Sequence, residues 1–192
     1  MAAPLEKSTS DMTGVWVMPD DSLYNFEHSD PIDPTFAIQG IPWLIRKVLA
    51  YASVTLTLTH STEPAKDGSG DITKVRMKQT ISPGSFSNED DYILDSETRE
   101  ATVPIFGTIA MYAKYTPLAE LEDKELRTRL EEGKTGAAAI QEIATNKGAG
   151  WDAVGTWGFE IIDGQRYFTR TTVTKKGDQE VSVRLVYDYR ED

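Results

Sequence analysis

Apolar and polar residues alternate with a period of two over much of the chain, and this pattern predicts β-strands. In the segment 53–60, Val54, Leu56 and Leu58 share one face with His60, while threonines occupy the opposite face. The same alternation predicts further strands at 13–18, 71–81, 91–98, 103–115, 154–163, 166–175 and 180–190. Because closure removes exposed sheet edges, we expect an all-β fold: a closed antiparallel barrel of about eight strands around an apolar ligand cavity.

Helical periodicity is confined to a few segments. From 38 to 52, apolar residues recur every three or four positions, and Pro42 suits the first turn of a helix. We expect this helix, which carries Trp43, to form a lid or plug over the barrel after the first strand. The segments 118–130 and 136–145 also look helical, although neither could bury a core alone. The chain is therefore expected to be a single domain over 1–192, with 1–10 as a loose leader.

Two hairpin turns determine the register of the last three strands. Asp163-Gly164 favours a type I′ turn, which needs positive φ at both positions, and Gly177-Asp178 gives a similar signal. The first turn places Trp157 opposite Arg170, and the second places Arg170 opposite Leu185. Both turns assign the same inward face, which is mostly apolar. Its members are Trp157, Phe159, Ile161, Phe168, Arg170, Thr172, Val181, Val183, Leu185 and Tyr187.

The charge balance narrows the range of partners. The chain has 192 residues, a formal net charge of −11 and a sequence pI of about 4.7. Such a surface repels phosphate backbones and anionic lipid heads, so we expect neither nucleic acid nor a membrane as partner. The chain has no cysteine and two histidines, and it shows no metal motif, phosphate-binding loop or Ser-His-Asp signature. We expect no metal, no cofactor, a monomer or homodimer, and, without a signal-peptide pattern, a cytoplasmic location.

Arg170 is the sharpest candidate for chemistry, because it is a cation on an apolar inward face. A buried guanidinium is costly unless it is paired, so Arg170 either binds a carbonyl, phenolate or carboxylate of a ligand, or stacks on Trp157 as a structural cation–π pair. Tyr187 on the same face can polarise a carbonyl with its hydroxyl, or merely cap the core. His60, in phase with an apolar face, is a candidate general base, or a solvated residue at a strand end.

The remaining candidates would bind a ligand rather than react with it. The residues predicted to contact a substrate are Trp157, Phe159, Phe168, Leu185, Gln79 and Trp43. An aromatic wall would suit a flat conjugated ligand, while plain core packing is the alternative reading for the aromatic residues. Gln79 shares its phase with Val75 and Met77 and would add an inward amide. Trp43 would lie on the lid helix, or on a plug that is permanently buried.

Three blocks of the chain resemble a known group of proteins. They are AIQGIPWLIRKVLAYASVTL (37–56), WGFEIIDGQRYFTR (157–170) and VRLVYDY (183–189), and the first strand also carries Gly14-x-Trp16, which matches the lipocalin signature. Together they are similar to small lipocalin-like proteins of filamentous fungi, within the calycin group of lipocalins and fatty-acid-binding proteins. The resemblance implies a lipocalin-like barrel, a helical segment after the first strand and a structural plug at Trp16. The Arg-x-Tyr carboxylate clamp of fatty-acid-binding proteins is not reproduced, because the last strand reads Arg184-Leu185-Val186-Tyr187.

The same resemblance suggests an activity, since some fungal proteins of this shape are pericyclases. It implies a cofactor-independent cyclase or isomerase of specialised metabolism, of the Diels–Alder type, which folds a reactive polyene or quinone methide in the barrel cavity. Arg170 and Tyr187 would then polarise a carbonyl of that apolar small molecule. The alternative is a non-catalytic carrier of an apolar metabolite, and a third possibility is an interaction protein whose barrel is filled by side chains.

Overall fold

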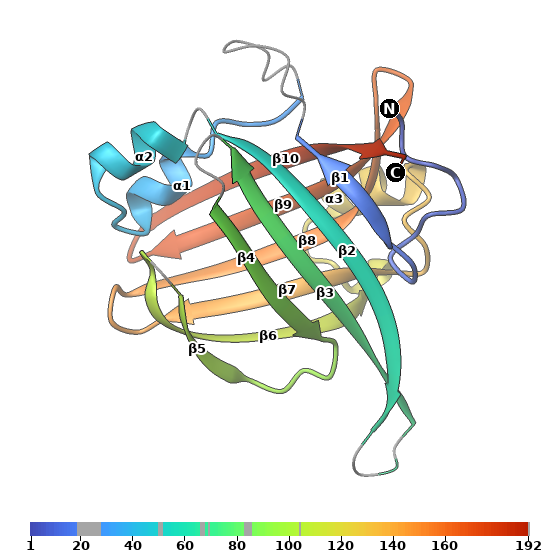
Figure 1. Ribbon diagram of the computed structural model, residues 1–192, viewed down its shortest axis with the longest axis horizontal. Coiled ribbons are helices and arrows are strands. Elements are labelled where there is room, and N and C mark those ends of the chain that lie inside the picture. Colours follow the sequence, from blue (N-terminus) through green and yellow to red (C-terminus); the bar gives the residue numbers. More distant parts are fainter. Residues whose placement is uncertain are drawn as a thin grey trace.

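Ten antiparallel strands form one strongly curved sheet in the computed structural model, which describes residues 1–18, 28–49, 52–65, 68, 70–82, 86–103 and 105–191 (Figure 1). The strands are β1 (Gly14–Val17), β2 (Ser53–Pro64), β3 (Asp71–Ser82), β4 (Phe86–Ile93), β5 (Arg99–Val103), β6 (Gly107–Pro117), β7 (Ala138–Asn146), β8 (Trp151–Ile162), β9 (Gln165–Lys176) and β10 (Gln179–Arg190). Their order in the sheet is β4-β3-β2-β1-β10-β9-β8-β7-β6-β5. The fold is therefore all-β, as the alternating pattern predicts.

The sheet is a half-barrel rather than the closed barrel of about eight strands expected from the sequence. Strands β4 and β5 are its two edges, and the hydrogen-bonded ladders of the described residues do not join them. The segment that connects β4 to β5 spans the gap. Its Leu94 amide donates to the Thr73 carbonyl on β3, and its Ser96 amide donates to the Ala113 carbonyl on β6. Acidic residues at 89–91 mark β4 as an edge strand, which charges protect from further pairing.

The hairpins at the C-terminal end confirm the register inferred from the turns. Asp163 and Gly164 both adopt positive φ, of 50° and 78°, as a type I′ turn requires. Trp157 pairs with Arg170, and Arg170 pairs with Leu185. The register of β8, β9 and β10 is therefore the one that the two turns predict, although Ile161 on the predicted inward face is 45% exposed.

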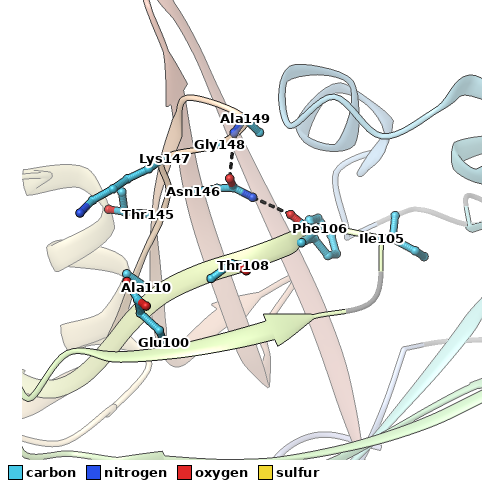
Figure 2. A pocket seen from close by; sticks show the side chains of 11 residues that line it. Glu100, Ile105, Phe106, Thr108, Ala110, Thr145, Asn146, Lys147, Gly148 and Ala149 are labelled. Atoms are coloured by element: carbon cyan, nitrogen blue, oxygen red, sulfur yellow. Dashed lines mark hydrogen bonds between the residues drawn. The ribbon is translucent and has the colours of Figure 1, made fainter.

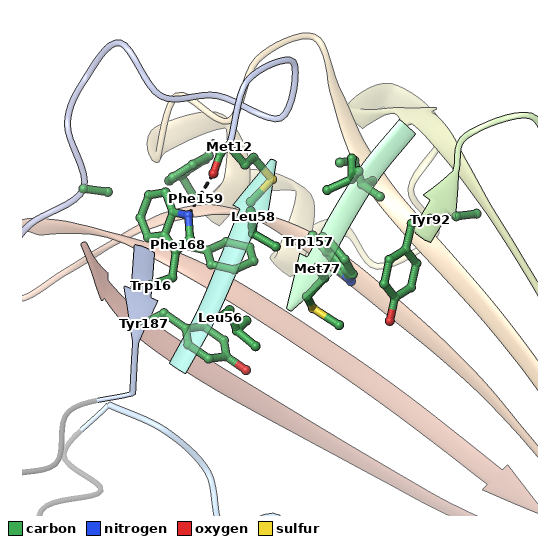
Figure 3. Packing of buried hydrophobic residues seen from close by; sticks show 14 residues of the cluster. Met12, Trp16, Leu56, Leu58, Met77, Tyr92, Trp157, Phe159, Phe168 and Tyr187 are labelled. Atoms are coloured by element: carbon green, nitrogen blue, oxygen red, sulfur yellow. Dashed lines mark hydrogen bonds between the residues drawn. The ribbon is translucent and has the colours of Figure 1, made fainter. Parts of the chain in front are cut away.

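An aromatic plug, made of Trp16, Phe159, Phe168 and Tyr187, fills the core behind β1 (Figure 3). Trp16 has no exposed surface, and its indole N–H donates to the Met12 carbonyl at 2.9 Å. Its ring meets Phe159, Phe168 and Tyr189 edge-on at 5.0–5.8 Å. Gly14 makes this packing possible, because a Cβ at its φ of +145° would lie 2.7 Å from the Tyr189 ring.

Helix α3 (Lys124–Glu132), which follows the short 3₁₀ turn η1 (Leu118–Glu120), covers the outer face of β8. Asp123 caps its N-terminus by accepting a hydrogen bond from the Leu126 amide at 2.9 Å. Two glycines allow the close approach: a Cβ on Gly133 would collide with the Phe159 carbonyl, and one on Gly158 would lie 2.6 Å from Leu130. The outer face of β8 is thus buried from Thr156 to Glu160, whereas Asp152 and Val154 on the same face are exposed.

Two helical predictions need correction. The single helix expected over 38–52 is two short ones, α1 (Asp33–Ile38) and α2 (Trp43–Leu49), separated around Gly40, whose φ of +84° ends α1; residues 50 and 51 lie outside the described part. The segment 136–145, expected to be helical from its alanines, contains most of β7. Pairing with β6 and β8 on both sides outweighs the helical propensity of alanine there. None of the described helices is long and apolar enough to span a membrane.

Residues 1–10 are fixed to the barrel instead of forming a loose leader. The Arg166 guanidinium donates to the carbonyls of Pro4, Lys7, Gly133 and Lys134 at 2.5–3.2 Å, and its central carbon lies 3.9 Å from the Phe159 ring centroid. Every nitrogen of this buried cation therefore has an acceptor.

The close contact between α3 and β8 predicts that Gly158→Ala destabilises the fold by about 1–3 kcal/mol, because the new methyl group overpacks the Leu130 side chain. Gly148→Ala is the matched control, since a Cβ there meets only Asn146 at an ordinary 3.5 Å. Urea denaturation of both variants measures the difference. Equal midpoints for the two variants would contradict the packing described for α3.

Candidate functional site

An ion pair lies inside the half-barrel, beyond the aromatic plug. Arg170 on β9 donates from Nη2 to Glu142 Oε1 on β7 at 2.8 Å, and the two side chains are 14% and 15% exposed. The guanidinium carbon lies 4.7 Å from the centroid of the Trp157 ring, and Nη1 lies 3.9 Å from the Met77 sulfur. Arg170 is therefore both paired with a carboxylate and stacked on an indole. The cation–π contact with Trp157, given above as an alternative to ligand binding, is present in the structure.

A glycine on the neighbouring strand makes room for the acidic partner. Gly155 on β8 pairs with Glu142, and a Cβ there would lie 2.7 Å from the Glu142 side chain. Although burial works in the opposite direction, the Glu142 carboxylate holds the pKa of Arg170 above its usual value. The guanidinium is therefore a permanent positive charge in this interior.

Two phenols complete the cluster around this pair. Burial raises the pKa of Tyr92 well above its usual value, and the negative charge of Glu142 adds to the effect. Burial also raises the pKa of Tyr187, while the Arg170 cation opposes the shift. Tyr92 packs edge-on against Trp157 at 4.9 Å, and Tyr187 stacks on Phe168 at 5.2 Å. Both hydroxyls are therefore protonated hydrogen-bond donors at neutral pH.

The side of the cluster toward β4 is only half-buried. Asp90 accepts a hydrogen bond from Asn88 at 2.5 Å, and burial raises its pKa despite that bond, with a further contribution from Glu142. Gln79 and Leu185, both expected to contact a ligand, are also inward and half-buried. We call Asp90, Tyr92, Glu142, Arg170 and Tyr187 the interior cluster.

Some polar atoms of this region are buried without a partner in the described part of the chain. They are Glu142 Oε2, Arg170 Nε and Trp157 Nε1. Buried polar groups are nearly always hydrogen-bonded, and each exception calls for an explanation. One acceptor and two donors are thus available at the ion pair.

Other sequence-predicted residues lie elsewhere. Phe159 and Phe168 belong to the aromatic plug and have no exposed surface. Core packing, the alternative to substrate contact, therefore describes both residues. His60 is half-buried with both ring nitrogens unpartnered among the described residues, but its neighbours are Asp11 and Lys7 of the N-terminal segment, and burial lowers its pKa. Trp43 lies on α2 with 62% of its surface exposed.

Sequence reasoning missed Glu142, Asp90 and Tyr92. Glu142 falls in a segment whose alanines favour a helix, and this hides its position on a strand. Asp90 and Tyr92 lie on β4, which begins at Phe86, five residues before the strand expected from the alternation. One pattern in the sequence could have identified Glu142. If Ala138–Asn146 is read as a strand, Glu142 falls on the same face as the apolar residues Ile140 and Ala144.

A separate cavity of about 530 Å³ opens at the surface where the β5–β6 turn meets the β7–β8 turn (Figure 2). Asn146 holds these turns together by donating to the Phe106 carbonyl at 2.6 Å and accepting from the Ala149 amide at 2.8 Å. Glu100, Thr108 and Ala110 line it, and none of the interior cluster does. The hydrogen bonds of Asn146 therefore stabilise the two turns. Among the described residues that line the cavity, no side chain has a buried polar atom without a partner.

Two curated proteins are similar to the chain over most of its length. No family model matches the chain. It is 32% identical over 190 residues to the probable pericyclase scpY of Mollisia scopiformis, covering 98% of this chain and 94% of that protein. It is 29% identical over 167 residues to the pericyclase pydY of an Acremonium species, covering 86% of this chain and 87% of that protein.

Solved structures show the same architecture at low sequence identity. A Schistosoma mansoni fatty acid binding protein in complex with arachidonic acid matches with a TM-score of 0.55 at 14% identity, covering 96% of this chain and 100% of the other. A fatty-acid-binding protein from Drosophila melanogaster brain matches with a TM-score of 0.53 at 12% identity, covering 93% and 99%. The protein thus has a calycin-like fold, with its ten strands arranged as a half-barrel. Within that class, the chain belongs to the family of the probable pericyclase scpY.

The raised tyrosine pKa values predict two stages of phenol ionisation. Tyrosines of the unfolded chain ionise near pH 10, whereas Tyr92 and Tyr187 in the fold ionise later. The stability that they contribute is full below about pH 10 and falls as the pH rises further, because the unfolded state then loses protons first. Tyrosinate absorbance, with circular dichroism to verify folding, measures this. Tyr92→Phe and Tyr187→Phe should each reduce the absorbance change of the second stage, above pH 10. Ionisation of all tyrosines in one stage near pH 10, with the protein still folded, would contradict this prediction.

The ion pair predicts strong coupling between its two members. Glu142→Ala leaves a buried, uncompensated guanidinium and should cost about 3–5 kcal/mol, while the double variant with Arg170→Leu should cost clearly less than the sum of the two single changes. Denaturation of the four proteins gives the coupling energy. Glu180→Ala, which removes the exposed ion pair with Lys175, is the control and should barely change the midpoint. Additive losses would show that Arg170 and Glu142 act independently.

Proposed function

We propose that the protein is a pericyclase-type cyclase or isomerase that folds a reactive, apolar substrate within the half-barrel. The observation that carries the proposal is the interior cluster, where a charged pair, two protonated phenols and the half-buried Asp90 carboxyl lie in a mostly apolar interior. The membership of the chain in the scpY family supports the same reaction class. A Diels–Alder-type cycloaddition of a polyene or quinone methide, without a cofactor, is the specific form of the proposal.

Such a reaction needs orientation and modest polarisation rather than acid–base catalysis. Apolar walls hold a flexible polyene in a folded conformation, which removes most of the entropy cost of bringing its reacting carbons together. Arg170 and Tyr187 are the residues proposed to donate hydrogen bonds to a carbonyl conjugated with the dienophile. In a site of low dielectric constant, these donors stabilise the charge that develops on the oxygen in the transition state.

The second candidate is a carrier that binds an apolar metabolite without changing it. The structural likeness to fatty-acid-binding proteins favours this function, because the same interior would hold a ligand equally well. Arg170 and Glu142 would then only anchor its polar end. A cytoplasmic location and a monomeric or homodimeric state belong to both versions of the proposal.

Deleting the gene in the producing organism and profiling its metabolites separates the two candidates. A cyclase predicts that a cyclised product is lost or loses stereochemical purity and that its linear precursor accumulates. A carrier predicts the same products in altered amounts. An unchanged profile would count against the cyclase.

Purified variants then test the residues. With the accumulated precursor as substrate, Tyr187→Phe should slow cyclisation by about 100-fold, as removal of one donor to a developing oxyanion does, and Arg170→Lys should slow it while retaining the positive charge. Tyr167→Phe is the matched control, because Tyr167 lies on the outer face of β9 and its hydroxyl contacts Gln165. Unchanged rates in the inward variants, with folding intact, would exclude these donors from the reaction.

A further inference from the structure

Two buried carboxylates of this protein differ in a way that points to a ligand. Glu160 lies on the outer face of β8 with no exposed surface, and both of its oxygens are used: Oε2 accepts from Arg129 at 2.9 Å and from Arg184 at 3.2 Å, and Oε1 accepts from Thr169 at 3.0 Å. Glu142 faces the interior, and only its Oε1 is bonded, whereas Oε2 is buried without a partner in the described residues. The Glu160 carboxylate therefore joins elements of the fold, whereas the Glu142 carboxylate keeps one oxygen that could accept a hydrogen bond from a ligand.

The two buried arginines differ in the same way. Arg166 directs its Nε and both terminal nitrogens at backbone carbonyls. Within the described part of the chain, Arg170 leaves its Nε unpartnered, and the neighbouring Trp157 indole N–H is unpartnered too, on a side chain with no exposed surface. Leaving such groups unpaired costs free energy, so an unpartnered donor and an unpartnered acceptor on the two members of one ion pair favour an occupant that satisfies both.

The charge of the interior cluster limits what that occupant can be. With both carboxyls ionised, Asp90 and Glu142 outweigh Arg170 by one negative charge. Burial and the negative charge of Glu142 both raise the pKa of Asp90, and the same two effects disfavour a further anion there. A fatty-acid carboxylate would also compete with Glu142 for Arg170 and would leave Glu142 Oε2 without a donor.

Resting on the function proposed above, we infer that the substrate is neutral at its polar end and carries an O–H or N–H donor beside a carbonyl. The donor binds Glu142 Oε2, and the carbonyl accepts from Arg170 Nε or Trp157 Nε1. The same arrangement discriminates against free carboxylic acids, although the fold is that of fatty-acid-binding proteins. Glu142 is thereby a specificity-determining residue, because it recognises the group next to the carbonyl that Arg170 polarises.

Three forms of one fluorescent polyene test this inference. The probes are cis-parinaric acid, its primary amide and its N,N-dimethylamide, which share a conjugated apolar chain and differ only in the polar end. Fluorescence titration at neutral pH should give a dissociation constant for the primary amide about tenfold lower than for the other two, since about 1.4 kcal/mol of preference corresponds to a factor of ten. The dimethylamide lacks the donor, and the acid carries the unfavourable charge.

Glu142→Gln should abolish that preference. The oxygen of the substituted side chain would remain on Arg170, so its NH₂ group would replace the free acceptor by a donor. The constants of the primary amide and the dimethylamide should then agree within about threefold, and the acid should bind more tightly than to the unsubstituted protein, because one negative charge is gone. Glu63→Gln, on an exposed part of β2, is the control and should keep the full preference. Circular dichroism verifies that the variants fold.

The outcomes separate this inference from the proposed function. Equal affinities of the three probes for the unsubstituted protein would overturn the inference while leaving a polyene-binding barrel in place. Tightest binding of the acid would overturn it in favour of fatty-acid recognition. Failure of all three to bind would contradict the proposed function itself, because an apolar polyene would then have no place in the interior.

Discussion

The interior of this protein depends on one interaction, the ion pair between Arg170 and Glu142. Each ion alone would be costly in a half-barrel whose walls are mostly apolar, and together they fix a polar point between β7 and β9. Other features are arranged around that pair: Gly155 leaves space for Glu142, Trp157 lies against the guanidinium, and Tyr92 and Tyr187 bring their phenols near its charges. A polar group built into an apolar interior with spare hydrogen-bonding atoms is what a ligand site requires.

The rest of the fold keeps this interior in shape from outside. Behind the aromatic plug, α3 lies against β8, and the Glu160 carboxylate links it through Arg129 and Arg184 to β10. Arg166 fixes the N-terminal segment across the same end of the barrel. The buried charges of Glu160 and Arg166 are fully hydrogen-bonded, whereas Glu142 and Arg170 each keep one atom without a partner in the described part of the chain. Glu160 lies on the outer face of β8, whereas Arg166 shares the inward face of β9 with Arg170, nearer the start of that strand.

The C-terminal strands could be predicted well because their turns are local signals. Asp163-Gly164 sets a register within two residues, and from that register the inward position of Arg170 follows without knowledge of the rest of the fold. Its partner was not predictable in the same way. Glu142 lies on a strand whose alanines favour a helix, and only pairing with β6 and β8 determines which way it faces. The number of strands and the gap between β4 and β5 likewise depend on contacts distant in sequence.

The most direct test of the central claim is a crystal structure of the protein with the primary amide of parinaric acid bound. This account predicts that the polyene lies in the half-barrel, with its amide nitrogen within hydrogen-bonding distance of Glu142 Oε2 and its carbonyl oxygen within that distance of Arg170 Nε or Trp157 Nε1. A ligand found instead in the surface cavity beside Asn146, or an interior ligand whose polar end faces away from the ion pair, would contradict it.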